Sequence, residues 1–489
     1  MSPSEANSAI SGSFRDREGR VYRCDGRIFR GLSQNALESF RQLEQTRFYD
    51  KFKADGRLVE SREIGADDTP LPDAVRRQWA GFLEHAPIPA ISYPYEWTYG
   101  MLRDAALLQL DLVEAALVEN MALKDASPYN IQFVGDQPVF IDIASFTPLD
   151  PGATWAGYRQ FCEMFLFPLM LQAYKGVHFQ PFMRAGIDGV DVQTAAALFG
   201  FRDRFRKGVF SHVWLQSRLD RRYGGTQQNM RSGLKSAGFN REMILANVRR
   251  IRKLIKRLAW RGEGSEWAAY AEFHNYSDAD HELKKRFVED AAADLRPDVA
   301  WDIGCNTGQF SRIVARHSGL VLAMDLDHFA VECLYRDLKT EDTDNILSIV
   351  QNIANPSPNW GWNNQERTDL KSRAAPDLVL CLALIHHVVI SANIPLQEFI
   401  AWLAELGSDL VLEYVSREDD KVQTLLRNKE ETYDDYSREN LERALKEHFT
   451  ILRQETLPSG NRHLYRCQRH RIPGRSQQTP ESEEPATAA

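Results

Sequence analysis

Two stretches of the C-terminal half carry the residue types of a nucleoside-binding site. V-A-W-D-I-G-C-N-T-G, 299–308, is an apolar run that ends in Asp302 and enters a turn containing Gly304 and Gly308. Glycine lacks a Cβ atom, so the backbone of such a turn can approach a ligand closely. L-V-L-A-M-D-L-D, 320–327, places Asp325 about 20 residues further on, where an acceptor for ribose hydroxyls is expected. Asp302 can reach the charged end of the same ligand, directly or through water.

Taken one at a time, these residues have a purely structural alternative. The glycines are compatible with a plain tight turn, and Asp325 is compatible with a cap on the following helix. Only their joint occurrence, followed by further apolar strands in order, favours the ligand site.

Polar residues also end two later apolar runs. His386 and His387 close P-D-L-V-L-C-L-A-L-I-H-H, and Glu413 lies near the end of S-D-L-V-L-E-Y-V. An open α/β sheet forms its ligand crevice at the carboxyl ends of its strands. An imidazole there can act as a general base toward an acceptor hydroxyl, although a hydrogen-bonded structural histidine fits equally. Glu413 is the second candidate base.

A third group of chemical residues lies in the N-terminal half. L-K-D-A-S-P-Y-N, 123–130, sets Asp125 before Asn130 in a D-x-x-x-x-N spacing, and Asp142 follows a second strand. One base and two oxygen ligands for Mg²⁺ at such spacing can serve phosphoryl transfer. The alternative is an accessory helical domain in which Asp125 and Asn130 cap turns.

The elements that must position these groups show in the hydrophobic pattern. Residues 19–32 alternate about Asp25-Gly26 and predict a β-hairpin, and 161–174 predict a buried helix. Residues 240–261 form a basic amphipathic helix, either a bridging helix with solvated charges or a surface for an anionic partner. Beyond residue 266, strands and helices alternate, which predicts an α/β fold with a parallel sheet.

The turn D-I-G-C-N-T-G differs from the G-x-G-x-x-G of dinucleotide enzymes and resembles motif I of class I S-adenosylmethionine (SAM) methyltransferases. I-V-Q-N-I-A-N-P-S-P resembles their third strand, and later runs resemble strands four to seven of a Rossmann-like, seven-stranded sheet. Asn352 replaces a frequent acidic residue and can accept a hydrogen bond from the adenine amino group. The resemblance implies that SAM binds to Asp302, Gly304, Cys305, Asn306, Gly308, Asp325, Leu326 and Asn352, with His386, His387 and Glu413 toward the acceptor.

The segment P-N-W-G-W-N-N-Q-E-R, 358–367, follows the third strand and is expected beside the cofactor. Its two tryptophans either stack on adenine or acceptor, or anchor a packed loop. This segment together with the run from residue 382 to 426 is similar to a bacterial group that includes nodulation-associated methyltransferase-like proteins. That similarity implies a small-molecule, glycan or lipid-linked acceptor.

The D-x-x-x-x-N loop resembles the catalytic loop of the protein-kinase superfamily. The resemblance implies an α+β kinase-like domain in which Asp125 is the base, and Asn130 and Asp142 hold Mg²⁺ of Mg-ATP if the site is active. Leu123 replaces the usual histidine, Ile143-Ala144 replaces Phe-Gly, and no glycine-rich loop is apparent upstream. These departures argue for weak or absent nucleotide binding.

The 489 residues exceed one ordinary core and predict several domains. The formal net charge of −8 argues against nucleic acid as a partner, and the six scattered cysteines favour a reducing cytoplasm. No segment predicts a transmembrane helix, although peripheral membrane contact stays open. The expected division is a flexible tail 1–17, a kinase-like domain 18–235, a basic helical connector 236–265, a methyltransferase domain 266–470 and a disordered tail 471–489.

The sequence therefore predicts a SAM-dependent methyltransferase. Two alternatives stay open, a bifunctional kinase and methyltransferase of glycan biosynthesis, and a non-catalytic scaffold that binds SAM.

Overall fold

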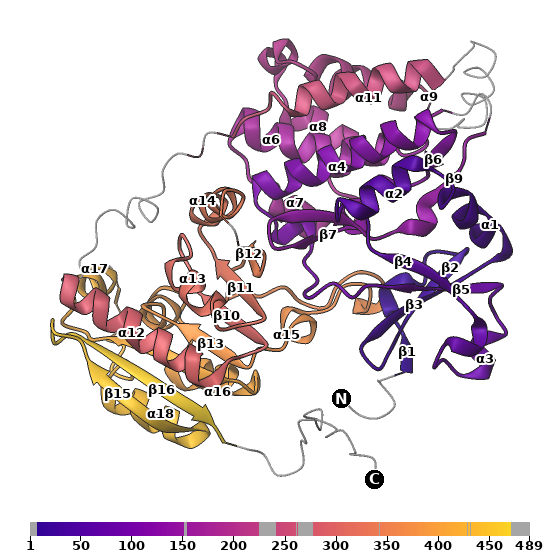
Figure 1. Cartoon of the computed structure of the whole chain (residues 1–489). Helices are drawn as coiled ribbons and strands as arrows, with labels where there is room; N and C mark the ends of the chain where they lie inside the picture. The colour runs from indigo at the N-terminus through magenta and orange to yellow at the C-terminus, as the bar shows by residue number, and fades with distance from the viewer. Residues whose placement is uncertain are drawn as a thin grey trace, which may run out of the picture. The chain divides into compact units, whose positions relative to one another are not determined.

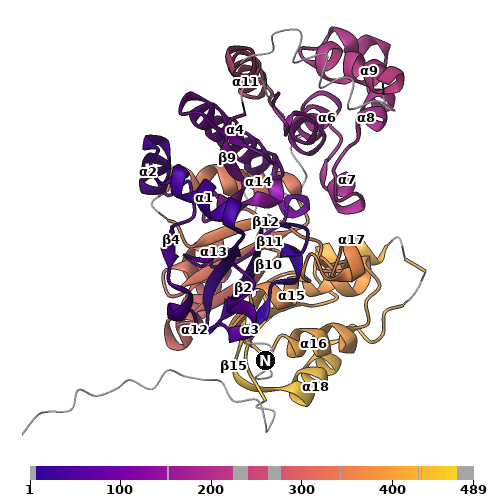
Figure 2. The same ribbon diagram turned by 90° about the vertical axis from the view of Figure 1, so that its right-hand side faces the viewer.

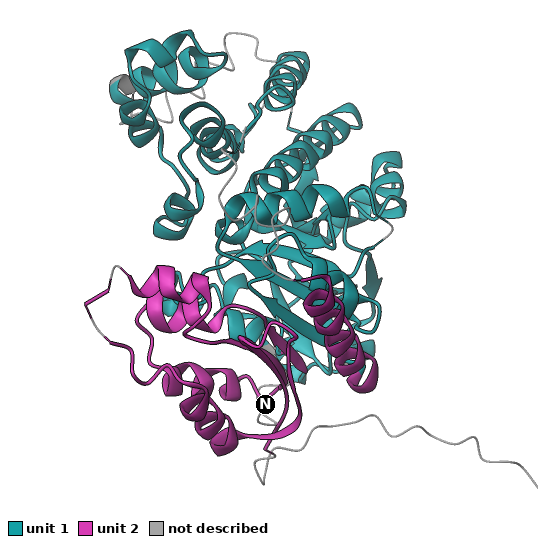
Figure 3. Cartoon of the chain, turned by 90° about the vertical axis from the view of Figure 1, so that its left-hand side faces the viewer, with its two compact units in different colours: residues 1–275, 296–375 teal, residues 276–295, 376–489 magenta. Residues whose placement is uncertain are grey.

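The computed structural model describes residues 7–150, 154–223, 241–260, 262, 277–341, 343–427, 429–430 and 432–470. It forms two compact units (Figure 3). The first unit comprises residues 1–275 and 296–375, and the second comprises residues 276–295 and 376–489. The expected tail 471–489 and residues 1–6 lie outside the described residues.

The first unit begins with a five-stranded antiparallel sheet. The predicted hairpin is confirmed, because the second and third strands are joined at Asp25 and Gly26, which both have positive φ as the tight hairpin turn requires. Phe29, Phe82 and Leu71 form part of the core on this sheet. In spatial order its strands are β1 (Asn7–Ala9), β2 (Gly19–Cys24), β3 (Arg27–Leu32), β5 (Gly81–His85) and β4 (Ser61–Ile64).

The strand β1 lies within the expected flexible tail 1–17, of which the structure describes residues 7–17. Asn7 pairs with Cys24 and Ala9 pairs with Tyr22, so this segment supplies an edge strand to β2. A 3-10 helix, η1 (Ser11–Ser13), follows it. The polar composition of this segment does not indicate a strand, because an edge strand pairs through its backbone and does not need apolar side chains.

A long buried helix, α4 (Tyr99–Val118), follows the sheet, and Thr98 caps its first turn. Two small ladders come next, formed by β6 (Met121–Leu123) with β9 (Phe146–Pro148) and by β7 (Ile131–Val134) with β8 (Gln137–Phe140). Residues 161–174 are a buried helix as predicted, with a π-helical turn in its first part.

The basic helix of the expected connector 236–265 is α11 (Arg241–Ile255), which lies along α4 (Figure 1). Its apolar stripe is buried, Arg249 pairs with Glu114 at 2.7 Å, and Arg252 pairs with Asp111 at 3.0 Å. These contacts support the bridging interpretation over a free surface for an anionic partner.

Three helices lie between strands of the first sheet along the chain: α1 (Gln34–Leu43), α2 (Arg47–Ala54) and α3 (Asp73–Arg76). Later helices of the first unit form a largely helical group (Figure 2). They include α5 (Tyr158–Phe161), η6 (Cys162–Leu166), α6 (Phe167–Lys175), α7 (Gln180–Ala185), α8 (Val192–Leu198), η7 (Phe201–Phe205), η8 (Val209–Trp214) and α9 (Leu215–Tyr223).

The predicted seven-stranded sheet is confirmed, in the order β12-β11-β10-β13-β14-β16-β15. The strand β11 runs parallel to β10 and to β12, and β13 runs parallel to β14. The strand β16 runs antiparallel to β14 and β15. The strands are β10 (Val299–Ile303), β11 (Leu320–Asp325), β12 (Ile346–Val350), β13 (Leu378–Cys381), β14 (Asp409–Val415), β15 (Phe449–Thr456) and β16 (Arg462–Arg469).

Helices accompany these strands within each unit. The first unit contributes α13 (Gln309–Ala315), α14 (His328–Leu338) and α15 (Leu370–Arg373). The second unit contributes α12 (Asp278–Leu295), η11 (His387–Ser391), α16 (Leu396–Glu405), α17 (Asp420–Leu426) and α18 (Arg438–His448).

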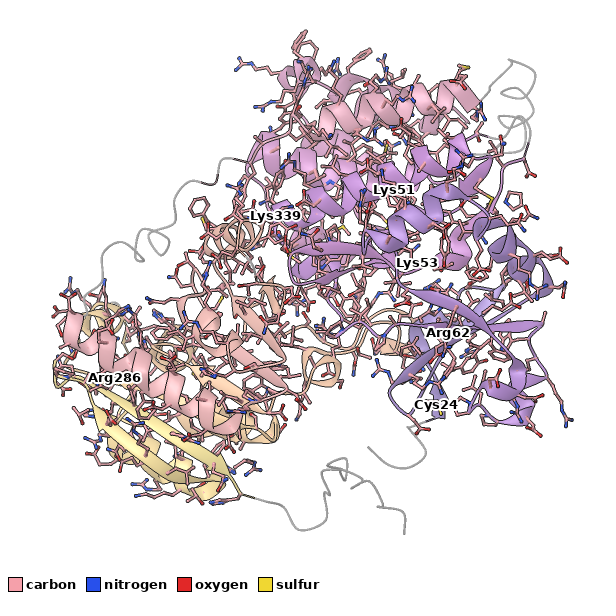
Figure 4. The ribbon with its side chains drawn as sticks, in the orientation of Figure 1. Cys24, Lys51, Lys53, Arg62, Arg286 and Lys339 are labelled. Atoms are coloured by element: carbon pink, nitrogen blue, oxygen red, sulfur yellow. The ribbon has the colours of Figure 1, made fainter. Side chains whose placement is uncertain are left out.

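The sequence predicts a division of the chain at the connector 236–265, but the compact units divide elsewhere. The reason is that β10, β11, β12 and their helices pack on the N-terminal region. Tyr335 of α14 is fully buried, and its hydroxyl donates to Asp104 of α4 at 2.8 Å. The Gly100 amide donates to Glu332 at 2.7 Å, and Lys339 forms an ion pair with Asp104 (Lys339 is labelled in Figure 4). These contacts join residues that the expected division assigns to different domains.

Candidate cofactor and catalytic sites

The turn after β10 has the backbone geometry that its glycines allow. Gly304 and Gly308 have φ values of 81° and 79°, in the left-handed region that favours glycine. A Cβ atom on Gly308 would lie 2.5 Å from a methyl carbon of Leu334, so packing also requires glycine there. The amides of Gly304 and Cys305 both donate to the Met324 carbonyl of β11, which fixes the turn beside that strand.

Asp302 connects this turn to the helix that follows it. Its side chain is buried, and the Ser311 hydroxyl of α13 donates to Oδ2 at 2.6 Å. The nearby Cys305 is buried as well, and burial raises the pKa of its thiol well above the ordinary value. Both residues therefore support the turn, and the thiol is uncharged at neutral pH.

Asp325, at the end of β11, is the acidic residue that the turn meets directly. Its carboxylate accepts hydrogen bonds from the Asn306 amide at 2.8 Å and from the Asp327 amide at 2.9 Å. Burial raises the pKa of Asp325 above its ordinary value, while the two amides act in the opposite direction. The next residue, Leu326, is 58% exposed. An acidic acceptor and an exposed apolar side chain therefore stand together beside the glycine turn.

Asn352 lies just beyond β12. Its Oδ1 accepts from the Ala354 amide at 2.9 Å, so the carboxamide already shapes its own turn. The carbonyl oxygen has a second lone pair, and a contact with adenine stays a prediction. The structure thus brings the glycine turn and Asp325 together within the first unit, with Asp302 and Cys305 packed beneath the turn.

His386 and His387 lie at the start of η11 in the second unit, with ring centroids 4.2 Å apart. His386 is buried, and burial, with the charges of His387 and Arg462, holds its pKa well below the ordinary value. His387 is partly exposed, and burial lowers its pKa to about 4. Both rings are neutral at pH 7, and His387 is the more accessible of the two.

Glu413 does not have the surroundings of a catalytic base. It is completely buried in β14, where its carboxylate lies 2.5 Å from Lys284 Nζ of α12 and 3.1 Å from Arg462 Nη1 of β16. Arg462 also pairs with Asp419 at 3.1 Å. Although burial opposes it, the two cations hold the pKa of Glu413 below its ordinary value. Glu413 is therefore a buried ion-pair residue, and its role as a catalytic base stays a prediction.

The N-terminal group also converges. The Asn130 amide nitrogen donates to Asp142 Oδ2 at 3.4 Å, and the remaining oxygen of Asp142 forms an ion pair with Arg30 of β3. Asp125 is exposed as a residue, yet desolvation of its carboxyl, and the nearby charge of Asp142, raise the pKa of Asp125. Asp125, Asn130 and Asp142 thus lie near one another, while Arg30 is a member of the group that the sequence did not indicate.

The tryptophan-containing segment contacts the N-terminal region. Trp360 packs edge to face on Tyr95, with centroids 6.1 Å apart, and Trp362 packs on Phe14 at 5.3 Å. Arg15 forms an ion pair with Glu366. Within the first unit this segment therefore behaves as a packed anchor, the second of the two interpretations offered above.

A buried ion pair holds the end of the same segment. Arg373 Nη1 lies 2.7 Å from Glu96 Oε2, its other terminal nitrogen contacts Oε1, and the two side chains are only 3% and 1% exposed. The Ser357 hydroxyl donates to the same Glu96. Sequence inspection could not find this pair, because its members are far apart along the chain and neither belongs to a motif.

Among the described residues, no three or more His, Cys, Asp or Glu side chains are grouped as a metal site would require. The described helices also include none that combines the length and apolarity needed to cross a membrane.

Comparison with known proteins finds a similarity that extends over most of the chain. The chain is 30% identical over 462 residues to the nodulation protein NoeA of Rhizobium meliloti (strain 1021), covering 94% of this chain and 96% of that protein. No protein-family model matches the chain.

Similar solved structures include the N-methyltransferase NodS of Bradyrhizobium japonicum WM9, at 13% identity, with 40% of this chain and 98% of that chain covered and a TM-score of 0.28. They also include magnesium protoporphyrin IX methyltransferase of Synechocystis PCC 6803 with bound S-adenosylhomocysteine, at 17% identity, 45% and 100% coverage and a TM-score of 0.29.

Proposed function

Because the chain belongs to the family of the nodulation protein NoeA, we propose that it is a SAM-dependent methyltransferase acting on a small-molecule, glycan or lipid-linked acceptor. The observation that carries the proposal is the hydrogen bond from the Asn306 amide, inside the glycine turn, to the carboxylate of Asp325. This bond joins the two sequence features of a nucleoside site into one structure.

In the proposed site, Asp325 accepts hydrogen bonds from the ribose hydroxyls, and Leu326 offers an apolar contact to adenine. Gly304 and Gly308 let the backbone approach the amino-acid end of SAM, and Asn352 contacts the adenine amino group. Asp302 and Cys305 keep the turn in place. SAM supplies an electrophilic methyl group, so alignment of the acceptor provides much of the rate and a strong base is not required.

Replacement of Asp325 tests the cofactor site. Asp325→Ala should weaken SAM binding by about 1–3 kcal/mol, the cost of losing hydrogen bonds to a charged group. Calorimetry measures this change. The full chain is used because β10, β11 and β12 pack on the N-terminal region. Asp298→Ala, an exposed aspartate just before β10, is the matched control and should bind like the wild type. Equal affinities in all three proteins would refute the assignment of Asp325.

We assign the acceptor side to His387, because it is neutral at pH 7 and the more accessible of the histidine pair. His387→Ala should lower turnover on the order of 100-fold if the imidazole acts as general base, with SAM affinity unchanged. His448→Ala, at the end of α18, is the control. The purified protein and SAM are added to an extract of cells that lack the protein, which supplies the acceptor. Turnover is then measured as the release of S-adenosylhomocysteine. A matching loss of SAM affinity would instead make His387 a structural residue.

A second candidate function is nucleotide binding by a kinase-like N-terminal region. The convergence of Asp125, Asn130 and Asp142 favours it, since a base and two metal ligands must face one phosphoryl group. The ion pair between Arg30 and Asp142 supplies a cation near that point, but it also occupies an oxygen that Mg²⁺ would need. Binding should therefore be weak.

A thermal-shift measurement with Mg-ATP tests the second candidate. The wild type should show a small stabilisation that Asp142→Ala abolishes, because the mutant lacks a ligand for the metal. Asp55→Ala, an exposed aspartate after α2, should keep the shift. No shift in the wild type would reject nucleotide binding.

SAM binding without any methyl transfer would favour the alternative of a non-catalytic scaffold that binds SAM.

A further inference from the structure

An exposed group of aromatic side chains lies in the helical part of the first unit, apart from both proposed sites. Phe201 and Phe205 of η7 are 67% and 84% exposed, and Phe210 of η8 is 60% exposed. Leu215 and Leu219 of α9 add two further exposed apolar side chains. Several large apolar groups on contacting short helices mark an interaction surface, whereas single exposed ones need no explanation.

This exposure belongs to an ordered structure. Val209 and Val213 are fully buried and hold η8 against the core, and a Cβ atom on Gly208 would lie 2.5 Å from side chains of Met170 and Leu254. Asp203 is buried within η7 and pairs with Lys175 at 2.9 Å. The inward positions are thus filled by other residues, and the phenylalanines are directed to solvent.

Basic residues alternate with these phenylalanines. Arg202, Arg206 and Lys207 are exposed, and among the described residues neither Arg202 nor Lys207 has an ion-pair partner. Asp203 is the one carboxylate in residues 201–210, and Lys175 and Arg206 neutralise it. The surface therefore combines exposed aromatic rings with uncompensated positive charge.

We propose that residues 198–219 form a membrane-docking surface that binds an anionic lipid bilayer. Phenylalanine side chains enter the boundary between headgroups and acyl chains, and arginine and lysine bind the negative headgroups. A soluble acidic partner would need the basic residues but would not need three exposed phenylalanines. Docking is peripheral, and the inference is independent of the proposed methyl transfer.

Co-sedimentation of the full chain with vesicles tests this surface. The protein should bind vesicles of phosphatidylcholine mixed with phosphatidylglycerol, bind pure phosphatidylcholine much less, and lose affinity as salt rises. The double variant Phe201→Asp, Phe205→Asp should bind about tenfold more weakly or worse, because two apolar side chains no longer leave water. Arg202→Glu combined with Lys207→Glu should weaken binding to the anionic vesicles.

Leu452→Asp, which replaces an exposed apolar residue of β15, is the matched control and should bind like the wild type. Thermal melts verify that each variant is folded. Failure of the wild type to bind anionic vesicles would overturn the proposal, and so would an equal loss in Leu452→Asp. A change in oligomeric state in the Phe201→Asp, Phe205→Asp variant without vesicle binding would also overturn it, in favour of a second copy of the chain as the partner.

Discussion

Arg373→Ala is expected to lower the free energy of unfolding by about 3–5 kcal/mol, because it leaves the carboxylate of Glu96 buried without its cation. Arg373 contacts both oxygens of Glu96, and its guanidinium also lies 4.5 Å from the centre of the Tyr93 ring. Although burial opposes it, the Glu96 carboxylate raises the pKa of Arg373 above its ordinary value. The pair fastens α15 to the segment that leads into α4.

Denaturant unfolding of the full chain measures this loss. The control is Arg62→Ala, whose side chain is 71% exposed and pairs with Glu84 at the surface, where such pairs contribute about 1 kcal/mol or less. Glu96→Gln combined with Arg373→Met should recover part of the stability, since neither charge is then buried alone. An Arg373→Ala protein as stable as Arg62→Ala would contradict the account of this pair.

Glu413→Ala is expected to cost a similar amount, about 3–5 kcal/mol, because Lys284 and Arg462 would remain buried without their shared carboxylate. The prediction separates a structural from a catalytic role. If Glu413 is structural, its replacement lowers the free energy of unfolding. If Glu413 is a catalytic base, its replacement lowers turnover in a protein that unfolds normally.

Unfolding of Glu413→Ala and of the control Glu398→Ala, an exposed glutamate of α16, decides between the two roles. Because folding lowers the pKa of Glu413, its contribution to the free energy of unfolding is complete above the unfolded pKa of ~4.3 and is lost as pH falls through the lower folded pKa. The stability difference between wild type and Glu413→Ala should therefore shrink in acid. A variant of full stability and no activity would restore the catalytic interpretation.

Features with a local signal were predictable from the sequence. The Asp25-Gly26 hairpin follows from turn chemistry, and the first five strands of the seven-stranded sheet along the chain follow from apolar runs of strand length. The last two strands, β15 and β16, have no such run and follow only from the resemblance to class I methyltransferases. The sequence predicts that the glycine turn and Asp325 meet at one ligand, and in the structure the Asn306 amide donates a hydrogen bond to the Asp325 carboxylate.

Features that depend on distant partners were not predictable. Glu413 lies near the end of an apolar strand, in the position of a possible base, and nothing nearby in the sequence indicates that Lys284 and Arg462 enclose it. Arg30 looks like an ordinary polar residue of a hairpin until the fold places Asp142 against it. Periodicity reports which face of an element is buried, but it does not report the partner.

The division of the chain is a further example. The charge of the basic helix α11 indicates a connector, but Glu114 and Asp111 of α4 pair with its arginines. The charges that looked like a linker or a partner surface are thus part of the packing of the first unit.

The central claim is that the turn from Gly304 to Gly308, with Asp325, binds SAM. Isothermal titration calorimetry of the full chain with SAM and S-adenosylhomocysteine tests it most directly. We expect one saturable site for both ligands, weakened by Asp325→Ala and unchanged by Asp298→Ala. No binding of either ligand to the folded wild-type protein at millimolar concentration would contradict the account.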